Sequence, residues 1–203
     1  MAYKILILFT HPRFEQSRSN RVLVNAIPDH PDITFHDLYE QYADFNVDVA
    51  REQELVMNHD IIIWHHPLYW YSAPPLLKQW IDMVLEFGWA YGHGVTTLNG
   101  KLVFNTFTSG GPREAYSSDG RNCHPIRSFF TPFEQTARLC HMEYLPPFAV
   151  QGTHKLSDVE LYANGQAYAH LLLRLNEGGF SISEIQQHVF LNDWLSIPKT
   201  INP

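Results

Sequence analysis

Five short apolar runs, each followed by a polar segment or a turn residue, set the pattern of the chain. They cover residues 3–10, 33–38, 61–66, 101–108 and 148–150. The run at 61–66 reads IIIWHH, with no alternation between apolar and polar positions. A continuous run of this kind predicts a strand buried on both faces, as in a parallel sheet.

Segments with a helical period separate these runs. In residues 76–85 the apolar side chains recur at i, i+1, i+4, i+5, i+8 and i+9, which predicts a helix with one wide apolar face. Pro74 and Pro75 fall in its first turn, where proline is tolerated, and Gly88 is placed to end it. Trp80 lies on the apolar face, so we expect it in the core.

Capping residues and prolines mark the ends of the other predicted helices. A short polar side chain can accept a hydrogen bond from a free amide of the first turn, and glycine commonly ends a helix. On these signals we predict helices that begin near Ser17 or Ser19, after Asp48, after Pro125 with a break or kink at Pro132, and at the capping box Ser157–Glu160, the last ending at Gly178.

The alternation of five strands with helices predicts an α/β fold. The number of strands and the chain length fit a flavodoxin-like, doubly wound, five-stranded parallel sheet with helices on both faces. We assign residues 1–180 to this domain and leave 181–203 as a C-terminal tail of unassigned role, because its apolar residues have no clear period. Ligands of such sheets bind outside the C-terminal strand ends, which directs attention to the loops after Thr10, His65 and Thr108.

Composition narrows the class of protein. Of 203 residues, 17% are charged and 14% aromatic, which excludes a disordered chain or a coiled coil. The net charge of −7 and the scattered lysines and arginines argue against a nucleic-acid partner. Cys123 and Cys140 form no CxxC and are expected to be reduced. The apolar run near the N-terminus is too short for a signal peptide, so we expect a cytoplasmic protein.

The loop after the first strand, HPRFEQSRSN at 11–20, has the residues of an anion site. Hydroxyls and free backbone amides at a helix N-terminus attract phosphate. The simpler interpretation is that Ser17 or Ser19 only caps the helix, and the loop alone favours it. Neither GxGxxG nor GxxxxGK[ST] occurs, which argues against a Rossmann dinucleotide site and a P-loop.

Three successive aromatic residues, Tyr69, Trp70 and Tyr71, follow the third strand. At the C-terminal end of a strand they are placed to contact a flat ring system, since aromatic rings stack in offset or edge-on geometry. Covering the edge of the core is the alternative role, and composition alone does not separate the two.

The loop after the fourth strand contains Gly110 and Gly111, which would let the backbone approach a ligand closely. An ordinary turn is the alternative. Tyr116 and His124 follow, and either could donate a hydrogen bond to a developing anion. Residues of these types more often serve packing or solvation, so neither is a specific signal by itself.

Other chemistries lack their motifs. The chain contains neither the GxSxG of an α/β-hydrolase nor the HExxH of a zinc protease. His65 and His66 are neighbours on a predicted strand, so they point to opposite faces and suit no shared metal. The spacing of the twelve histidines gives no other metal signature, and we predict no metal site.

Taken together, the loops resemble the flavodoxin-like NAD(P)H:quinone oxidoreductase family, and within it the ancillary proteins of glutathione-gated potassium efflux antiporters. The resemblance rests on His11-Pro12 with Ser17 and Asn20, on residues 36–53 and 65–94, and on TSGG at 108–111. PLYWY followed by LLKQW and GWAYG is more specific than any single loop.

The resemblance implies a bound flavin, and the short chain beyond the fifth strand favours FMN over FAD. The residues implied to hold its phosphate and ribityl region are His11, Ser17, Arg18, Ser19 and Asn20. Those implied at the isoalloxazine ring are Pro67, Leu68, Tyr69 and Trp70 with Tyr71 beside them, and Thr108, Ser109, Gly110 and Gly111 at its pyrimidine edge. Tyr116 and His124 are the implied catalytic candidates. Asn122 occupies the spacing of the family's partner histidine, and His124 falls two residues later.

The function implied is that of an FMN-dependent NAD(P)H:quinone oxidoreductase, a homodimer that transfers hydride from NAD(P)H to flavin to quinone with ping-pong kinetics. The alternative is a regulatory ancillary subunit of a potassium efflux antiporter, peripheral at the inner membrane, with or without reductase activity. A one-electron carrier flavodoxin ranks lower, because its threonine-rich phosphate loop is missing from residues 11–20.

Overall fold

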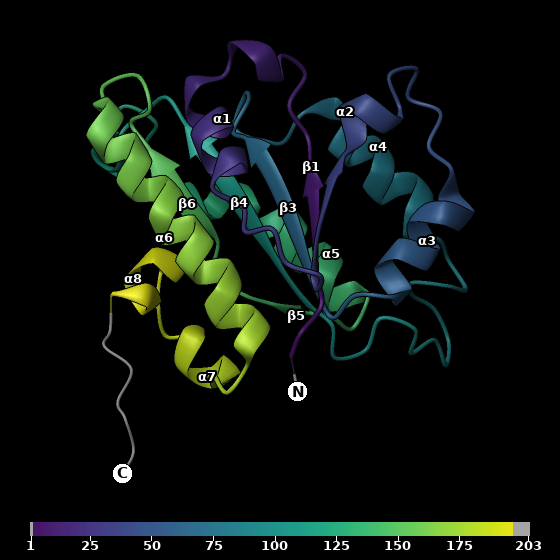
Figure 1. Cartoon of the computed structure of the whole chain (residues 1–203). Helices are drawn as coiled ribbons and strands as arrows, with labels where there is room; N and C mark the ends of the chain where they lie inside the picture. The colour runs from purple at the N-terminus through teal and green to yellow at the C-terminus, as the bar shows by residue number, and fades with distance from the viewer. Residues whose placement is uncertain (1, 197–203) are drawn as a thin grey trace.

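The computed structural model describes residues 2–196 and consists of a parallel sheet between two layers of helices (Figure 1). The strands are β1 (Ile5–Phe9), β2 (Ile33–Asp37), β3 (Ile61–Pro67), β4 (Leu102–Ser109), β5 (Glu143–Tyr144) and β6 (Phe148–Gln151). Their order is β2-β1-β3-β4-β5, with β6 also paired to β4, and every pairing among them is parallel. The predicted flavodoxin-like fold class is confirmed.

Helices cover both faces of the sheet, as Figure 1 shows for α6 on one side and α3 and α4 on the other. One face packs against α2 (Leu38–Gln41), α3 (Val49–Met57), α4 (Pro75–Val84) and α5 (Thr131–Leu139). The other packs against α1 (Arg18–Asn25), α6 (Asp158–Glu177), α7 (Ile182–Ile185) and α8 (Leu191–Leu195).

The strands read as continuous apolar runs because both faces are covered. In β1, Leu6 and Leu8 join the core beneath α3 and α4, whereas Ile5 and Ile7 join the core beneath α6. Strand β3 alternates in the same way. Successive side chains of a strand point to opposite faces, so β1 and β3 each contribute to both cores.

Most predicted helix ends are confirmed. Ser17 caps α1, Asp48 caps α3, and the capping box at Ser157 opens α6. Pro132 divides its segment into a 3₁₀ turn at Ile126–Phe130 and helix α5. Trp80 is buried in the core as expected.

The predicted role of Gly88 is wrong, because α4 ends at Val84. Gly88 instead lies in the loop that follows, where it adopts a φ of 86°. Its N–H donates to the Tyr91 carbonyl at 2.8 Å. The left-handed conformation that glycine favours therefore shapes this turn and not the helix end.

The fifth strand position is divided. Strand β5 pairs with Leu102–Val103 at one end of β4, and β6 pairs with Thr106–Ser109 at the other. Pro146 and Pro147 lie between them. Proline has no N–H to donate, so the pairing with β4 is interrupted at this point.

Part of the predicted tail shares the core of the domain. Ile185, Leu191 and Trp194 are fully buried on the α6 side of the sheet. The Asn192 side chain accepts from the Ala149 N–H at 2.8 Å and donates to the Ala149 carbonyl at 3.1 Å. Residues 197–203 of the tail lie outside the described residues. None of the helices in residues 2–196 is both long and apolar enough to cross a membrane.

Candidate functional site

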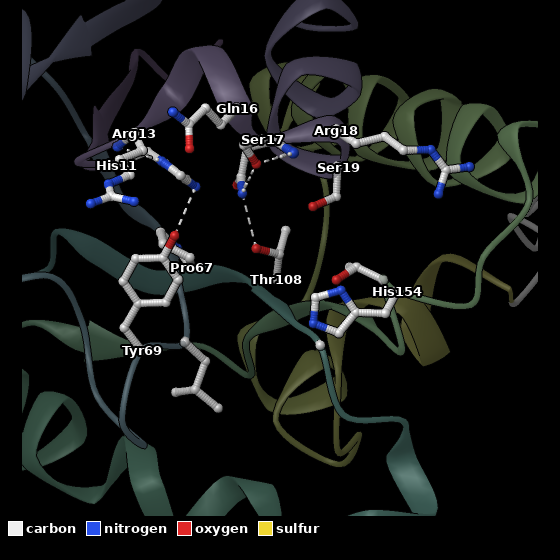
Figure 2. Close-up of a pocket in the computed structure, with 14 residues that line it drawn as sticks. His11, Arg13, Gln16, Ser17, Arg18, Ser19, Pro67, Tyr69, Thr108 and His154 are labelled. Atoms are coloured by element: carbon white, nitrogen blue, oxygen red, sulfur yellow. Dashed lines mark hydrogen bonds between the residues drawn. The ribbon is translucent and has the colours of Figure 1, made fainter.

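The loops after β1, β3 and β4 meet around one cavity of ≈ 590 Å³ at the C-terminal edge of the sheet. This volume lies within the range of small-molecule sites, about 300–1,000 Å³. Figure 2 shows side chains of all three loops pointing toward this space. We call it the first cavity. Its lining includes ten of the predicted site residues: His11, Ser17, Arg18, Ser19, Asn20, Pro67, Leu68, Tyr69, Thr108 and Gly110.

Ser17 both caps α1 and lines the first cavity, so its capping role leaves the anion site open as a prediction. Its Oγ accepts from the Asn20 backbone N–H at 3.2 Å. The amides of Arg18 and Ser19 come before any intrahelical acceptor, as in the first turn of every helix. The cavity therefore receives the positive end of the helix dipole.

Asn20 connects the first loop to the third. Its Nδ2 donates to Ser17 Oγ at 2.9 Å and to Thr108 Oγ1 at 3.0 Å. Its Oδ1 is buried and finds no partner among the described residues. A buried carbonyl oxygen without a donor costs about 1–3 kcal/mol. A ligand hydroxyl or N–H in the cavity would satisfy it.

His11 is held as one tautomer. Its Nδ1 accepts from the Arg13 N–H at 3.1 Å, so Nε2 carries the proton and faces Tyr69 Oη at 3.4 Å. Burial lowers the pKa of His11, with a backbone hydrogen bond opposing it. The neutral ring is therefore favoured, and its N–H points toward the cavity.

The aromatic segment of the second loop forms a two-residue hairpin turn. Tyr69 N–H donates to Ser72 O at 2.9 Å, and Ser72 N–H donates to Tyr69 O at 3.0 Å. The two central residues have positive φ, 49° at Trp70 and 64° at Tyr71. This is the pattern of a type I′ turn, which normally uses Asn and Gly. Bulky residues at such positions store about 1–3 kcal/mol each and cluster at functional sites.

Two substitutions of Trp70 that both remove the indole ring can test the backbone strain by itself. The Trp70 side chain is 93% exposed, so removing it costs little packing. We expect Trp70→Asn to be more stable than Trp70→Ala by about 1 kcal/mol, because Asn tolerates positive φ. In a protein of this size that corresponds to a Tm about 2–4 °C higher. Thermal unfolding of the two apoprotein variants measures it, and equal Tm values would refute strain at this turn.

The glycines of the third loop are tightly enclosed. A Cβ at Gly110 would lie 2.3 Å from His154 Nε2, and one at Gly111 would lie 3.0 Å from the Tyr116 ring. Ser109 is buried beneath them, and its hydroxyl donates to the Gly111 carbonyl at 2.9 Å. The loop thus brings its backbone to the cavity wall at two residues without side chains, packed closely beside the His154 and Tyr116 rings.

A second cavity of ≈ 530 Å³ adjoins the first, since Leu68, Gly110 and His154 line both. Of the predicted site residues it gathers Trp70, Tyr71, Gly111 and Tyr116, whereas Ser109 lines neither cavity. Burial raises the pKa of Tyr116, with the Ser109 hydroxyl opposing it. Tyr116 is therefore kept as a neutral O–H at the wall of this cavity.

His124 lines neither of the two cavities, and no hydrogen bond among the described residues joins it to Tyr116. Both rings pack edge-on against Phe129, with centroids 6.2 Å from Tyr116 and 6.3 Å from His124. Asn122 lines the second cavity and accepts from Tyr71 Oη at 3.2 Å. A catalytic role for Tyr116 and for His124 stays a prediction.

His154 is a site residue that the sequence did not reveal. It follows β6 and lines both cavities, and Figure 2 shows it at the wall of the first. The rule that selected the other loops, a position just after a strand end, applies to it as well. The prediction covers the loops after Thr10, His65 and Thr108, and His154 lies in the loop after the next strand position.

The two histidines of β3 face opposite sides of the sheet, as predicted. His65 packs edge-on against Phe9 and Tyr168, and His66 stacks on Phe133. Burial lowers the pKa of His65 to about 3 and that of His66 to about 4. Within residues 2–196 no three His, Cys, Asp or Glu side chains converge to hold a metal ion.

Comparison with known sequences gives one matching family and several relatives. The family described as the flavodoxin-like fold matches residues 3–172. The chain is 43% identical to an uncharacterized NAD(P)H oxidoreductase, YdeQ of Bacillus subtilis (strain 168), over 81% of this chain and 84% of that protein. It is 40% identical to the glutathione-regulated potassium-efflux system ancillary protein KefG of Salmonella paratyphi B, over 87% of this chain and 97% of the relative.

Solved structures give the same picture. General stress protein 14 of Treponema denticola, solved in complex with FMN, superposes with a TM-score of 0.80 at 37% identity, covering 85% of this chain and 99% of that one. An NADPH-quinone reductase from P. pentosaceus superposes with a TM-score of 0.75 at 32% identity, covering 82% and 96%.

Proposed function

Because the chain belongs to the flavodoxin-like fold family, we propose that it is an FMN-dependent NAD(P)H:quinone oxidoreductase. The observation that carries the proposal is the first cavity, in which the positive end of α1 and the unpaired Asn20 Oδ1 face a glycine loop. Relatives named as an NAD(P)H oxidoreductase and an NADPH-quinone reductase support the activity, and an FMN complex supports the cofactor.

The residues present fit such a cofactor. Ser17, Ser19 and the first amides of α1 offer hydrogen-bond donors to a phosphate, and Asn20 Oδ1 would accept from a ribityl hydroxyl. Backbone N–H groups around Gly110 and Gly111 would meet a ring edge and favour negative charge there. When bound, the flavin supplies the capacity to accept a hydride and to pass it on.

The second cavity is where we propose that the electron donor and the acceptor bind in turn. Trp70, Tyr71 and Tyr116 offer ring surfaces to flat molecules, and the Tyr116 hydroxyl can donate a hydrogen bond to an acceptor oxygen. Two substrates that share one space cannot be bound together. This arrangement favours ping-pong kinetics.

The test begins with the colour of the purified protein. We expect a yellow protein, or one that becomes yellow on reconstitution with FMN, and bleaching by NADH or NADPH without oxygen. Adding 2-methyl-1,4-naphthoquinone should restore the flavin spectrum, and double-reciprocal plots should be parallel. Failure to bind either FMN or FAD would overturn the proposal, whereas stable binding of FAD alone would correct the cofactor.

The alternative function is that of a regulatory ancillary subunit of a potassium efflux antiporter. The KefG relative, which matches across 87% of this chain, is the observation that favours it. The proposed location is then cytoplasmic and peripheral at the inner membrane, and a homodimer is the proposed assembly. Co-purification with the antiporter of the source organism, and light scattering of the pure protein, test the partner and the dimer respectively.

A further inference from the structure

The second cavity carries positive charge on an acidic protein. Its lining includes Arg121 and Lys155 but no Asp or Glu, although the whole chain has a net charge of −7. Both side chains belong to exposed residues on loops, and they come from distant parts of the chain. Their meeting at one cavity is a product of the fold and could not be read from the sequence.

Arg121 and Lys155 are free to meet a ligand. The ion pairs in residues 2–196 join other groups: Arg18 to Asp158, His36 to Glu52, Lys78 to Asp82 and Arg138 to Glu134. Asp158, the acid that follows Lys155 most closely in sequence, is held by Arg18 at 2.7 Å. The two cations at the second cavity are thus left without a carboxylate partner.

The other walls of the cavity are flat and hydrogen-bonding. The rings of Trp70, Tyr71 and Tyr116 line it, and Asn122 uses its Oδ1 to accept from Tyr71 Oη at 3.2 Å. That bond leaves the Asn122 Nδ2 as a donor. Rings together with unpaired cations and an amide donor match a flat molecule that carries an anionic group.

We propose that Arg121 and Lys155 select electron acceptors in which a planar ring bears a carboxylate or sulfonate, in preference to neutral quinones of the same ring size. The inference rests on the proposed function, because it names the acceptor class of the same site. The cations attract the anionic substituent at the cavity mouth while the ring lies against the aromatic wall. In this role Arg121 and Lys155 only bind the acceptor and exchange neither electrons nor protons with it.

The test compares 1,4-naphthoquinone-2-sulfonate with 2-methyl-1,4-naphthoquinone on the FMN-loaded protein. In Arg121→Gln/Lys155→Gln we expect kcat/KM for the sulfonate to fall about tenfold and that for the neutral quinone to change less than about twofold. The matched control is Arg51→Gln/Lys78→Gln, which removes the same charge from exposed positions outside both cavities. Raising the salt concentration should lower the wild-type kcat/KM for the sulfonate toward that of the double variant.

Three results would overturn the inference. The kcat/KM ratio of the two quinones could stay unchanged, the control variant could lower it equally, or the loss could be confined to the KM of NADPH relative to NADH. The last result would assign the cations to the phosphate of the electron donor. Each would leave the proposed function intact.

A binding assay keeps the inference testable if no quinone is reduced. Naphthalene-2-sulfonate and 2-naphthol are titrated into the protein, and quenching of tryptophan fluorescence reports binding. We expect the double variant to bind naphthalene-2-sulfonate about tenfold more weakly than the wild type and to bind 2-naphthol with unchanged affinity. Equal affinities for the sulfonate in wild type and variant would refute the assignment. Absence of all quinone reduction with binding intact would instead count against the proposed function.

Discussion

Replacing Glu52 with leucine is expected to lower the free energy of unfolding by about 4 kcal/mol, within the range for breaking a buried charged network. Glu52 is fully buried beneath α4. It accepts from His36 Nε2 at 2.8 Å, Tyr42 Oη at 2.6 Å and Trp80 Nε1 at 2.7 Å. Leucine fills much of the space but leaves three buried donors without an acceptor, each at a cost of about 1–3 kcal/mol.

Urea denaturation of the two proteins measures this effect. The matched control is Glu54→Leu, the same substitution at an exposed position of α3, which should change stability by less than about 0.5 kcal/mol. A loss below 1 kcal/mol for Glu52→Leu, or equal losses in both variants, would contradict the role of the network.

The Glu52 carboxylate should also affect how the stability of the protein changes at acid pH. Burial by itself raises the pKa of Glu52, but the hydrogen bonds from His36, Tyr42 and Trp80 together hold it below the ordinary value of 4.5. A depressed folded-state pKa stabilises the protein above 4.5, and the contribution is lost as pH falls through the folded pKa. Wild type should therefore lose more stability than Glu52→Gln on acidification below 4.5.

Replacing Asn20 with aspartate is expected to weaken FMN binding about 100-fold, or about 2.7 kcal/mol. Aspartate keeps the shape of the side chain and can still accept from the hydroxyls of Ser17 and Thr108, which now contact its Nδ2. It adds a negative charge to a cavity that we propose for a phosphate. Two like charges about 4 Å apart near a protein surface repel by about 4 kcal/mol.

Flavin fluorescence titration gives the two dissociation constants. Asn25→Asp is the control, because it makes the same change at the exposed other end of α1. Riboflavin provides a second comparison, since it lacks the phosphate and should lose less affinity than FMN. Equal losses for FMN and riboflavin would show that the negative charge added at position 20 does not repel the phosphate.

The elements of the fold were predictable where one physical signal dominates. The run IIIWHH predicts β3 because a strand covered on both faces needs no polar positions, and Ser157 with Glu160 predicts the start of α6 because the capping box is local. The helix end predicted at Gly88 was wrong because a left-handed backbone conformation is needed both at helix ends and in turns. The apolar stripe continues to Leu85, so the sequence offered no earlier end.

The loops that form the site were predictable, but their conformations and the contacts between them were not. A strand-end position directs attention to residues 11–20, 67–71 and 108–111, and these do meet at the two cavities. The turn at Trp70 and Tyr71 was not predictable, because neither residue favours positive φ. His154 follows a strand end, so the same rule applies to it, whereas the meeting of Arg121 with Lys155 was not predictable because it depends on how distant loops pack.

The contact between Asn192 and Ala149 bears on self-association. A strand at the border of a sheet presents free N–H and C=O groups on which another chain can add a strand, which leads toward aggregation. The amide of Asn192 occupies both groups of Ala149 in β6, and Pro146 and Pro147 interrupt the same border. Helix α8 thus covers the β6 border of the sheet and blocks strand addition at Ala149. A dimer that keeps this contact must associate through helices or loops on that side of the sheet.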